Sequence, residues 1–319
     1  GGTGSLGKAL AKRLLELDVD VVRIFSRNEN SQITMQSEMK DDRLRYFIGD
    51  IRDLPRLIKA MEDVDIVFHA AALKHVPVIE YNPFEAIKTN VLGSQNVIDA
   101  CLHENVETAI CVGTDKAVSP LNTYGATKLL MEKLFVTASN YTNPKRHRTK
   151  FVAIRYGNVL GSSGSVVPTL VKQIESGKNI TITDPNMTRF NITMNQALDF
   201  IIRSLKKGNG GEVFIPKLKA YSLEVLKDAI LEVMKKDVKT EIISVRPGEK
   251  YHESLISSEE IRNTFEDKDD YVILEDSLQN NIKTKKSTLT NQYSSDVVEC
   301  LTKKELKKIL IEEKLVSTK

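Results

Sequence analysis

Short apolar runs alternate with helical patterns through the first two-thirds of the 319-residue chain, and this alternation limits the possible folds more than any other feature. The strand-like runs are Val19–Phe25, Arg45–Ile48, Ile66–His69, Ala109–Val112 and Phe151–Arg155. Helical patterns lie between them, at Lys8–Leu17, Leu54–Met61, Asn90–Cys101 and Tyr124–Thr137. Because strands that alternate with helices are joined by right-handed crossovers, the pattern predicts an α/β fold with a doubly wound parallel sheet.

Beyond about Gly157 the alternation loosens, which predicts a smaller mixed α/β lobe attached to the sheet. The helical patterns of this part are Val166–Glu175, Met194–Leu205 and Ser222–Met234. We expect a sheet domain over residues 1–157 and a lobe mainly over residues 158–275, with parts that return to the sheet domain. Residues 276–319 form a C-terminal tail, in which the polar stretch Asp276–Gln292 precedes a last helix at Thr302–Glu313.

Composition and charge exclude several classes of protein. The net charge of +3 is too small to indicate a nucleic-acid partner. No run approaches the roughly 20 apolar residues that a membrane span requires, and no signal peptide is evident. His252 with Glu253 lacks a third ligand and is interpreted as structural, so no metal site is expected. The three cysteines, Cys101, Cys111 and Cys300, lack metal-like spacing, and Cys101 and Cys111 are expected to be inert core thiols, which fits a cytoplasmic protein.

A glycine-rich segment opens the chain and runs directly into the first helical pattern. Glycines let the backbone approach a pyrophosphate, and a helix N-terminus offers free N–H groups and a positive dipole. A loop of this kind follows a buried strand in dinucleotide-binding domains, so we expect a strand ahead of Gly1 that this sequence does not contain. The cofactor-binding residues predicted here are Gly1, Thr3, Gly4, Ser5, Leu6 and Gly7.

The ends of the next three strands supply more of the expected dinucleotide site. Ser26 and Arg27 stand where an NAD site normally has a carboxylate for the ribose 2′-hydroxyl. A hydroxyl beside a guanidinium suits a 2′-phosphate, which predicts NADP as the cofactor. Asp50-Ile51 can accept the adenine amino group, although a helix N-cap near Asp53 is the alternative. Small side chains that let the backbone close against a dinucleotide follow the fourth strand, at Ala70, Ala71 and Ala72.

A strand-end threonine and a tyrosine–lysine pair form the expected catalytic centre. Thr114 follows the strand Ala109–Val112, and Tyr124 and Lys128 are four residues apart on one face of a helix. A free tyrosine has a pKa of about 10, and a lysine ammonium and a nicotinamide cation nearby favour the phenolate. The pair could therefore remove a sugar hydroxyl proton while a hydride leaves carbon.

Six ordered motifs resemble the extended short-chain dehydrogenase/reductases, and more narrowly the inverting UDP-N-acetylglucosamine 4,6-dehydratases of pseudaminic-acid and related surface-glycan pathways. The motifs are HAAALKHVPVIEYNP, TNVLGSQNVI, TDKAVSPLNTYGATK, RYGNVLGSSGSVVP, MTRF and RPGEKYHE, which span nearly the whole chain. The resemblance implies a Rossmann domain at residues 1–157, a nucleotide-sugar-binding lobe, NADP, a UDP-sugar substrate and a homo-oligomer, expected to be a hexamer.

In the triplet Thr114-Asp115-Lys116, the resemblance makes Lys116 the base that abstracts the C5 proton and Asp115 the acid that protonates the departing C6 hydroxyl. Lys116 must then be neutral and Asp115 protonated, which requires shifted pKa values in a partly dehydrated pocket. The product would be a 4-keto-6-deoxy sugar with inverted C5, formed without net consumption of cofactor. A surface ion pair after a strand is the alternative for Asp115 and Lys116.

The resemblance also supplies substrate and further cofactor residues. Asn90, Tyr156 and Asn158 are expected at the cofactor, and Asn158 at the sugar nucleotide as well. Guanidinium groups can bind two phosphate oxygens at once, and Glu249 can accept ribose hydroxyls or orient an arginine. For each arginine a structural bridge between lobes is the alternative, and for Lys74 a solvated loop position. The substrate-binding set is Lys74, Asn158, Val166, Arg189, Arg246 and Glu249.

Two other functions fit parts of this pattern. A UDP-hexosamine 4-epimerase or reductase of the same fold would share the glycine loop, Tyr124 and Lys128, and Asp115-Lys116 would then be incidental. A catalytically silent NADP-binding scaffold predicts a blocked pocket or a missing catalytic group, whereas every expected group is present. One departure from the family is Gly113, where relatives often have serine.

Overall fold

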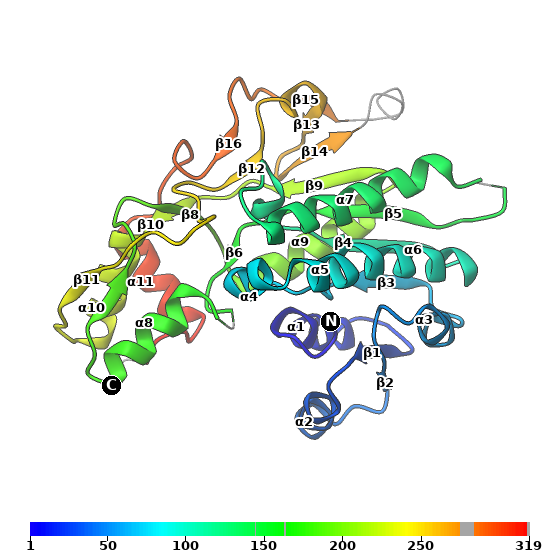
Figure 1. The fold of residues 1–319 in the computed structure, drawn as a ribbon, viewed down its shortest axis with the longest axis horizontal. Helices are drawn as coiled ribbons and strands as arrows, with labels where there is room; N and C mark the ends of the chain where they lie inside the picture. The colour runs from blue at the N-terminus through cyan, green and yellow to red at the C-terminus, as the bar shows by residue number, and fades with distance from the viewer. Residues whose placement is uncertain (144, 163, 275–283, 318–319) are drawn as a thin grey trace.

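A seven-stranded sheet forms the centre of the molecule, seen in a computed structural model that describes residues 1–143, 145–162, 164–274 and 284–317 (Figure 1). Four strands run parallel, β3 (Ile66–His69), β4 (Thr108–Val112), β5 (Lys150–Ile154) and β9 (Glu212–Pro216). Beyond β9 the sheet continues antiparallel through β14 (Asp270–Leu274), β13 (Thr264–Glu266) and β15 (Lys285–Lys286). The predicted parallel sheet is confirmed, and its antiparallel extension was not predicted.

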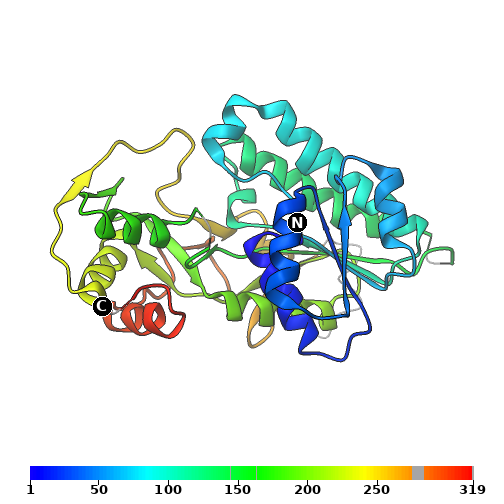
Figure 2. The same ribbon diagram turned by 90° about the horizontal axis from the view of Figure 1, so that it is seen from below.

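Helices cover both faces of this sheet, as the alternating side chains of its central strands require (Figure 2). On β4, Ala109 and Cys111 pack toward a core that includes Phe135, whereas Ile110 and Val112 pack toward Leu10 on the other face. The first face is covered by α3 (Leu54–Met61), α6 (Gly93–His103) and α7 (Thr123–Tyr141), and the second by α1 (Ser5–Leu15) and α9 (Met194–Lys207). The sheet is therefore doubly wound. Helix α9, expected in the lobe, packs on the sheet domain instead.

A gap separates the main sheet from a second pair of parallel strands, β1 (Val22–Ser26) and β2 (Leu44–Ile48), with α2 (Glu29–Met39) beside them. Among the described strands, β3 is the last of the main sheet on this side and has no pairing with β1. A cavity of about 560 Å³ lies between them, lined by apolar residues such as Val22, Ile24, Val67 and Phe68.

The smaller lobe has a separate apolar core, built by α8 (Val166–Glu175), α10 (Leu223–Met234) and α11 (Lys303–Glu312). Its strands form a three-stranded sheet of β6 (Asn158–Val159), β8 (Thr188–Ile192) and β10 (Ala220–Ser222), and a pair of β7 (Ile180–Ile182) with β11 (Thr240–Ile242). The C-terminal helix α11 therefore belongs to the lobe and is not a free tail. Part of the polar stretch Asp276–Gln292, residues 276–283, lies outside the described residues.

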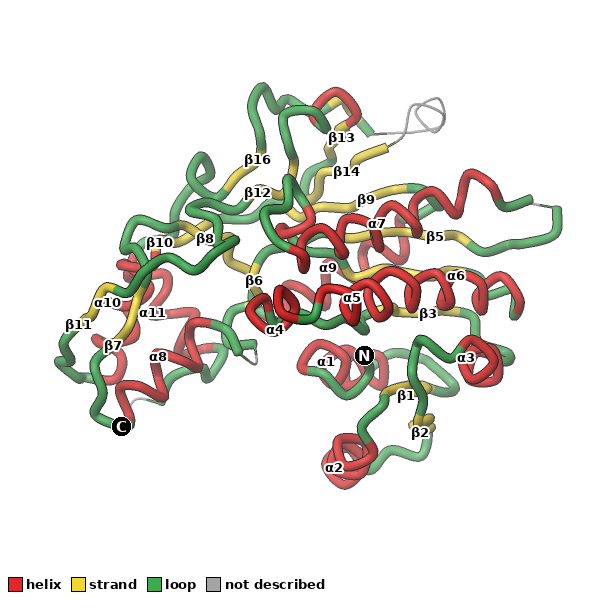
Figure 3. Tube along the Cα trace, viewed as in Figure 1, coloured by secondary structure: helices red, strands yellow, loops and turns green. Residues whose placement is uncertain are grey.

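Long loops join the lobe to the sheet domain (Figure 3). Short elements at this junction include α4 (Val76–Tyr81), α5 (Pro83–Ala86), the π-helix η1 (Ile87–Leu92), the 3₁₀ turns η2 (Asp115–Ala117) and η3 (Ile261–Asn263), and the strands β12 (Ser254–Ile256) and β16 (Tyr293–Ser294). Among the described helices, none has the length and apolar character to cross a bilayer.

Candidate active site

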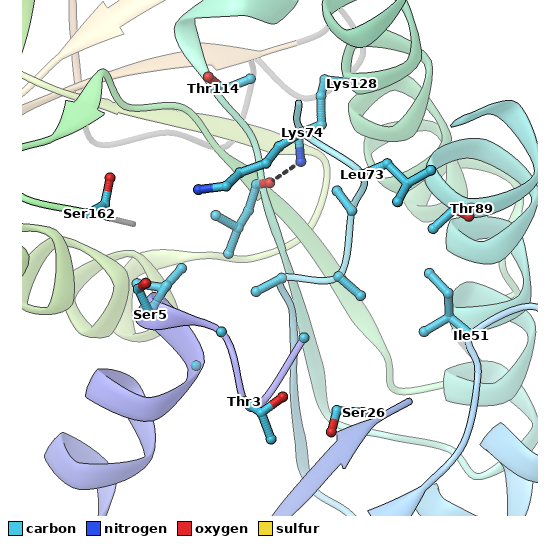
Figure 4. Close-up of a pocket in the computed structure, with 18 of the residues that line it drawn as sticks. Thr3, Ser5, Ser26, Ile51, Leu73, Lys74, Thr89, Thr114, Lys128 and Ser162 are labelled. Carbon is cyan, nitrogen blue, oxygen red and sulfur yellow. Dashed lines mark hydrogen bonds between the residues drawn. The ribbon is translucent and has the colours of Figure 1, made fainter. Parts of the chain in front are cut away.

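A cavity of about 680 Å³ lies at the carboxyl ends of β1 to β4, above the glycine loop (Figure 4). Lys74 extends its amine into the open centre of the cavity, on the side of Ser162. The structure brings most of the predicted cofactor residues together in its walls. They are Gly1, Thr3, Gly4, Ser5, Leu6, Gly7, Ser26, Arg27, Asp50, Ile51, Ala70, Ala71, Ala72, Tyr124, Lys128 and Tyr156, with Thr114 and Lys74 beside them.

The glycine loop is packed too closely for side chains. A Cβ at Gly7 would lie 2.5 Å from the carbonyl oxygens of Gly1 and Gly2, and one at Gly1 would lie 2.5 Å from the Ala70 carbonyl carbon. Gly4 is the N-cap of α1 and has no side chain to bind the first-turn N–H groups. The loop and the helix terminus therefore fit the pyrophosphate of a dinucleotide.

Local hydrogen bonds position the residues at the end of the cavity where the adenosine of a dinucleotide is expected. Gln32 Nε2 donates to Ser26 Oγ at 3.0 Å and to the Ser26 carbonyl oxygen at 3.1 Å. Arg27 is more than half exposed, and its Nη1 lies 3.9 Å from Asp50 Oδ2. Asp53, not Asp50, is the N-cap of α3, which leaves Asp50 in the cavity wall. However, Arg52 Nη2 already donates to Asp50 Oδ2 at 2.7 Å, so the adenine amino group would share this carboxylate.

The triplet after β4 forms a buried acid–base cluster. Asp115 has no exposed surface, and its Oδ1 accepts hydrogen bonds from Lys116 Nζ and Thr114 Oγ1, both at 2.8 Å. Lys116 Nζ also donates to Asn158 Oδ1 at 2.9 Å. Asp115 Oδ2 has no hydrogen-bond partner among the described residues. The surface ion pair considered for Asp115-Lys116 is therefore wrong.

The charge state of Lys116 differs from the sequence-based expectation. Burial lowers the pKa of Lys116, but the charges of Asp115 and Glu253 outweigh it and raise the pKa overall. The two carboxylates therefore favour the ammonium form of Lys116. This direction is opposite to the shift that the sequence argument required, because that argument counted dehydration and omitted the two carboxylates.

Tyr124 and Lys128 also differ in detail from the predicted pair. Burial raises the pKa of Tyr124 to about 12, opposed by the Lys116 charge and a hydrogen bond with Thr114. Lys128 Nζ donates to the Val112 carbonyl oxygen at 2.6 Å, and burial lowers its pKa. The lysine that lowers the tyrosine pKa here is therefore Lys116, and Lys128 ties α7 to the end of β4.

The predicted substrate arginines are linked through Glu249. Arg189 is buried, and its Nη2 donates to Glu249 Oε1 at 3.2 Å, while Arg246 is exposed and its backbone N–H donates to Glu249 Oε2 at 3.4 Å. Glu249 thus orients an arginine, which was one of its two predicted roles. The predicted residues outside the walls of the 680 Å³ cavity are Asp115, Lys116, Asn90, Asn158, Val166, Arg189, Arg246 and Glu249.

Asn90 does not reach the cavity, contrary to its predicted cofactor role. It is fully buried in the π-helix η1, where its Oδ1 accepts from the Leu73 N–H at 2.8 Å and its Nδ2 donates to the Leu73 carbonyl oxygen at 3.0 Å. The amide side chain fixes the backbone beside Lys74. Asn90 therefore acts on the site through Leu73, which does line the cavity.

Several lining residues were not predicted. Most are chain neighbours of predicted positions and could have been included by extending each strand end by a residue or two. Met194 and Ser162 come from segments whose placement needs the three-dimensional fold. The unpredicted lining residues are Phe25, Asn28, Gly49, Leu73, His75, Thr89, Val112, Gly113, Gly157, Val159, Ser162 and Met194.

The pair His252-Glu253 divides into two different roles. His252 Nδ1 lies 2.8 Å from Thr188 Oγ1, a contact within the protein that fits the structural interpretation of His252. The side chain of Glu253 points to the acid–base cluster, with Oε1 3.3 Å from Lys116 Nζ. Glu253 therefore contacts the acid–base cluster, a neighbour that the sequence-based interpretation did not include.

The doubly wound sheet, the glycine cradle at its carboxyl edge and the Tyr124–Lys128 helix define an extended short-chain dehydrogenase/reductase. Within that class, the chain belongs to the polysaccharide biosynthesis protein family, whose family model matches residues 1–275.

Relatives in this family have different names. The chain is 48% identical to a UDP-N-acetylglucosamine 4,6-dehydratase (inverting) of Campylobacter jejuni, over 86% of this chain and 80% of the relative. It is 42% identical to an uncharacterized membrane protein of Methanocaldococcus jannaschii (98% and 94%) and 39% identical to a UDP-glucose 4-epimerase of Rickettsia conorii (98% and 94%). Among solved structures, it resembles Pen from Bacillus thuringiensis with a TM-score of 0.92 and 40% identity, over 99% and 97% of the two chains.

Proposed function

We propose that the protein catalyses the NADP-dependent inverting 4,6-dehydration of UDP-N-acetylglucosamine. The product would be a UDP-2-acetamido-2,6-dideoxy-L-arabino-hexos-4-ulose for surface-glycan or nonulosonic-acid synthesis. The buried Asp115–Lys116 pair beside Tyr124 carries this proposal, because elimination of water needs both an acid and a base. The Campylobacter relative supports the choice of substrate.

Each side chain of the cluster has one proton to move. Tyr124 receives the proton of the C4 hydroxyl as its phenolate, the form that the Lys116 charge and a bound nicotinamide cation would favour. Accepting a hydride from C4 and returning it to C6 is the chemistry that the nicotinamide supplies when bound. Lys116 Nζ takes the C5 proton, the C5–H electron pair becomes the C5=C6 double bond, and the C6–O bond breaks as Asp115 protonates the departing hydroxyl. C5 is finally protonated on the opposite face, which inverts it, and the net change is loss of one water.

The ammonium form of Lys116 is compatible with this sequence of steps. Moving one proton along the 2.8 Å hydrogen bond from Lys116 Nζ to Asp115 Oδ1 converts an ammonium and a carboxylate into an amine and a carboxylic acid. The total charge does not change, so the transfer avoids the cost of adding net charge to a buried site. One transfer thus produces both the base and the acid that the elimination needs.

The choice of NADP rests on Ser26 and Arg27 at the ribose end of the cavity. The exposed Arg27 guanidinium, 3.9 Å from Asp50 Oδ2, can bind two oxygens of a 2′-phosphate, and β1 ends in Ser26 rather than in a carboxylate. For the diphosphate of the UDP-sugar we propose Arg189 and Arg246, with Glu249 orienting the former. Val166, Asn158 and Lys74 complete the proposed substrate set.

Incubating the enzyme with UDP-N-acetylglucosamine in deuterated water and identifying the product tests the proposed function directly. We expect NMR to show a 4-keto-6-deoxy sugar with deuterium at C5 and inverted C5 configuration. Epimerisation at C4 alone, without deuterium at C5, would instead support the 4-epimerase alternative, which the name of the Rickettsia relative favours. Retention of C5 configuration in a dehydrated product would overturn the inverting mechanism.

We propose that the protein forms a homo-oligomer, expected to be a hexamer, because neighbouring helices expose apolar side chains. Tyr81 is 88% exposed, and Val78, Phe84, Leu92 and Leu130 are each more than half exposed on α4, α5, η1 and α7. An apolar surface of this kind is typical of a subunit interface. Sedimentation should show an assembly that Tyr81→Asp shifts to smaller species, and a monomer at all concentrations would contradict this.

A cytoplasmic location is proposed from the cysteines. Cys101, Cys111 and Cys300 are all free thiols, which suits a reducing compartment. Cell fractionation tests the proposal, and recovery in the membrane fraction would favour the description given to the Methanocaldococcus relative.

A further inference from the structure

Glu253 presents a buried carboxylate to the amine of Lys116. It is 3% exposed, and its Oε1 lies 3.3 Å from Lys116 Nζ. The amine therefore has three polar neighbours, Asp115 Oδ1 at 2.8 Å, Asn158 Oδ1 at 2.9 Å and Glu253. An ammonium has three N–H donors, so these neighbours fix the direction of the whole group.

The position of Glu253 is set by its backbone and not by its side chain. The Glu253 N–H donates to Ser295 Oγ at 3.0 Å, and the Ser295 N–H donates to the Glu253 carbonyl oxygen at 2.8 Å. Its Oε2 has no hydrogen-bond partner among the described residues. Backbone hydrogen bonds thus hold the Glu253 carboxylate at the cluster. Among the described residues, this carboxylate forms its ion pair with Lys116.

Two buried carboxylates face a single amine in this cluster. Asp115 and Glu253 both contact Lys116 Nζ, while the Arg189 and Lys250 side chains also interact with the cluster. A carboxylate that served only to stabilise the fold would be expected to have hydrogen bonds to both oxygens. Glu253 instead has one oxygen without a hydrogen-bond partner among the described residues and aims the other at a proposed catalytic lysine, which indicates a role in the chemistry.

We propose that Glu253 is a positioning residue for the dehydration step, which holds Lys116 Nζ against Asp115 and controls how readily this amine gives up its proton. This inference rests on the proposed function and adds to it a residue outside the Asp-Lys pair. Glu253 does not itself touch the sugar in this role and acts through Lys116.

The direction of the effect follows from the groups that face Lys116. Asp115 and Glu253 raise the pKa of Lys116, and Arg189 on β8 lowers it. Tyr124 on α7 and Lys250 on the loop before β12 also interact with this cluster. Removing the Glu253 charge lowers the pKa of Lys116, so that the free amine is present at lower pH.

The test is the pH dependence of C5 deuterium incorporation in the unmodified enzyme and in Glu253→Gln. The substitution retains the shape of the side chain and removes its charge. We expect the rising acid limb of the profile to move to lower pH by about one unit, as removal of a charge in direct contact would produce. Glu253→Asp retains the charge on a side chain one methylene shorter. The acid limb of its pH profile should lie between those of the unmodified enzyme and of Glu253→Gln.

Glu299→Gln is the matched control, because Glu299 is an exposed carboxylate paired with Lys219 and has no contact with Lys116 among those found for the described residues. Its profile should coincide with that of the unmodified enzyme, and all variants should keep the same thermal unfolding midpoint. If the unmodified enzyme incorporates deuterium and the limb is unmoved in both Glu253 variants, the inference is wrong. If the unmodified enzyme incorporates none at any pH, the proposed function itself fails.

Discussion

Three consecutive residues at the end of β4 carry most of the proposed chemistry. Thr114, Asp115 and Lys116 share one hydrogen-bonded cluster because the chain enters the 3₁₀ turn η2 directly after the strand. Thr114 Oγ1 also accepts from the Lys116 N–H, which caps this turn. Local backbone geometry thus fixes the distance between the proposed acid and base.

Replacing Lys116 separates the two halves of the proposed reaction. In Lys116→Met, oxidation at C4 should slow because the Lys116 charge no longer favours the Tyr124 phenolate, whereas C5 exchange and water loss should fall further, by a factor of about 10² or more. Reduced cofactor would then accumulate, which is measured by its absorbance. Asp115→Asn should lose water elimination but retain some C5 exchange. A Lys116→Met enzyme that still dehydrates at the full rate would contradict the assignment of the base.

His69 makes the fold sensitive to acid. It is buried against Phe135, and its Nε2 lies 2.8 Å from Ser94 Oγ. Burial, with the nearby Lys128 charge, lowers its pKa to about 3. Because the unfolded chain takes up a proton near pH 6.5 and the folded chain does not, stability is full above that pH and falls as the pH drops.

The loss should amount to roughly 1.4 kcal/mol per pH unit between about pH 6 and pH 3. Urea unfolding at a series of pH values measures it. His69→Gln retains a hydrogen-bonding side chain that does not titrate, so its stability should depend less steeply on pH. Equal slopes for the two proteins would exclude His69 as the source.

At the scale of elements, the glycine loop leaves no room for a methyl group. Gly7→Ala would place its Cβ 2.5 Å from two carbonyl oxygens, so the loop must open and α1 must move. We expect at least a tenfold weaker affinity for the dinucleotide, measured by titration calorimetry. Lys12→Ala, on the exposed side of the same helix, should bind normally. Unchanged affinity in Gly7→Ala would show that the cofactor does not use this loop.

Hydrophobic periodicity in the sequence predicted the helices that bury one continuous face. The ranges expected for α3, α8 and the core of α7 are close to those observed, because their apolar residues recur at helical spacing. Helix α2 was missed, since it is polar and buries only Gln32 and Met35. The π-helix η1 was predicted as ordinary helix, because its distortion brings Asn90 to Leu73, a contact between segments 17 residues apart.

Site residues could be predicted from the sequence where the proposed function depends on the end of a single strand. The glycine loop, Ser26-Arg27 and Thr114-Asp115-Lys116 are each contiguous, so local residue types were informative. The contact of Glu253 with the cluster could not be predicted in this way, because Glu253 reaches Lys116 from a segment 137 residues further along the chain. The charge of Lys116 was mispredicted for the same reason, as its second carboxylate comes from that distant segment.

At the scale of the whole molecule, Arg155 connects the sheet, α7 and the segment after β12. Its guanidinium is 1% exposed and donates to Glu132 through Nε and Nη2 and to Glu260 through Nη1 and Nη2, with Nη2 at 2.6 Å from each carboxylate. Arg155→Met would leave the buried Glu132 and the partly buried Glu260 without this cation and should cost about 3–5 kcal/mol of unfolding free energy.

Denaturant unfolding measures this loss. The matched control is the double variant Arg155→Met/Glu132→Met, which removes a charge of each sign and should lose less stability than the single variant. An equal loss in both proteins would mean that side-chain packing, and not the charge balance, makes Arg155 important.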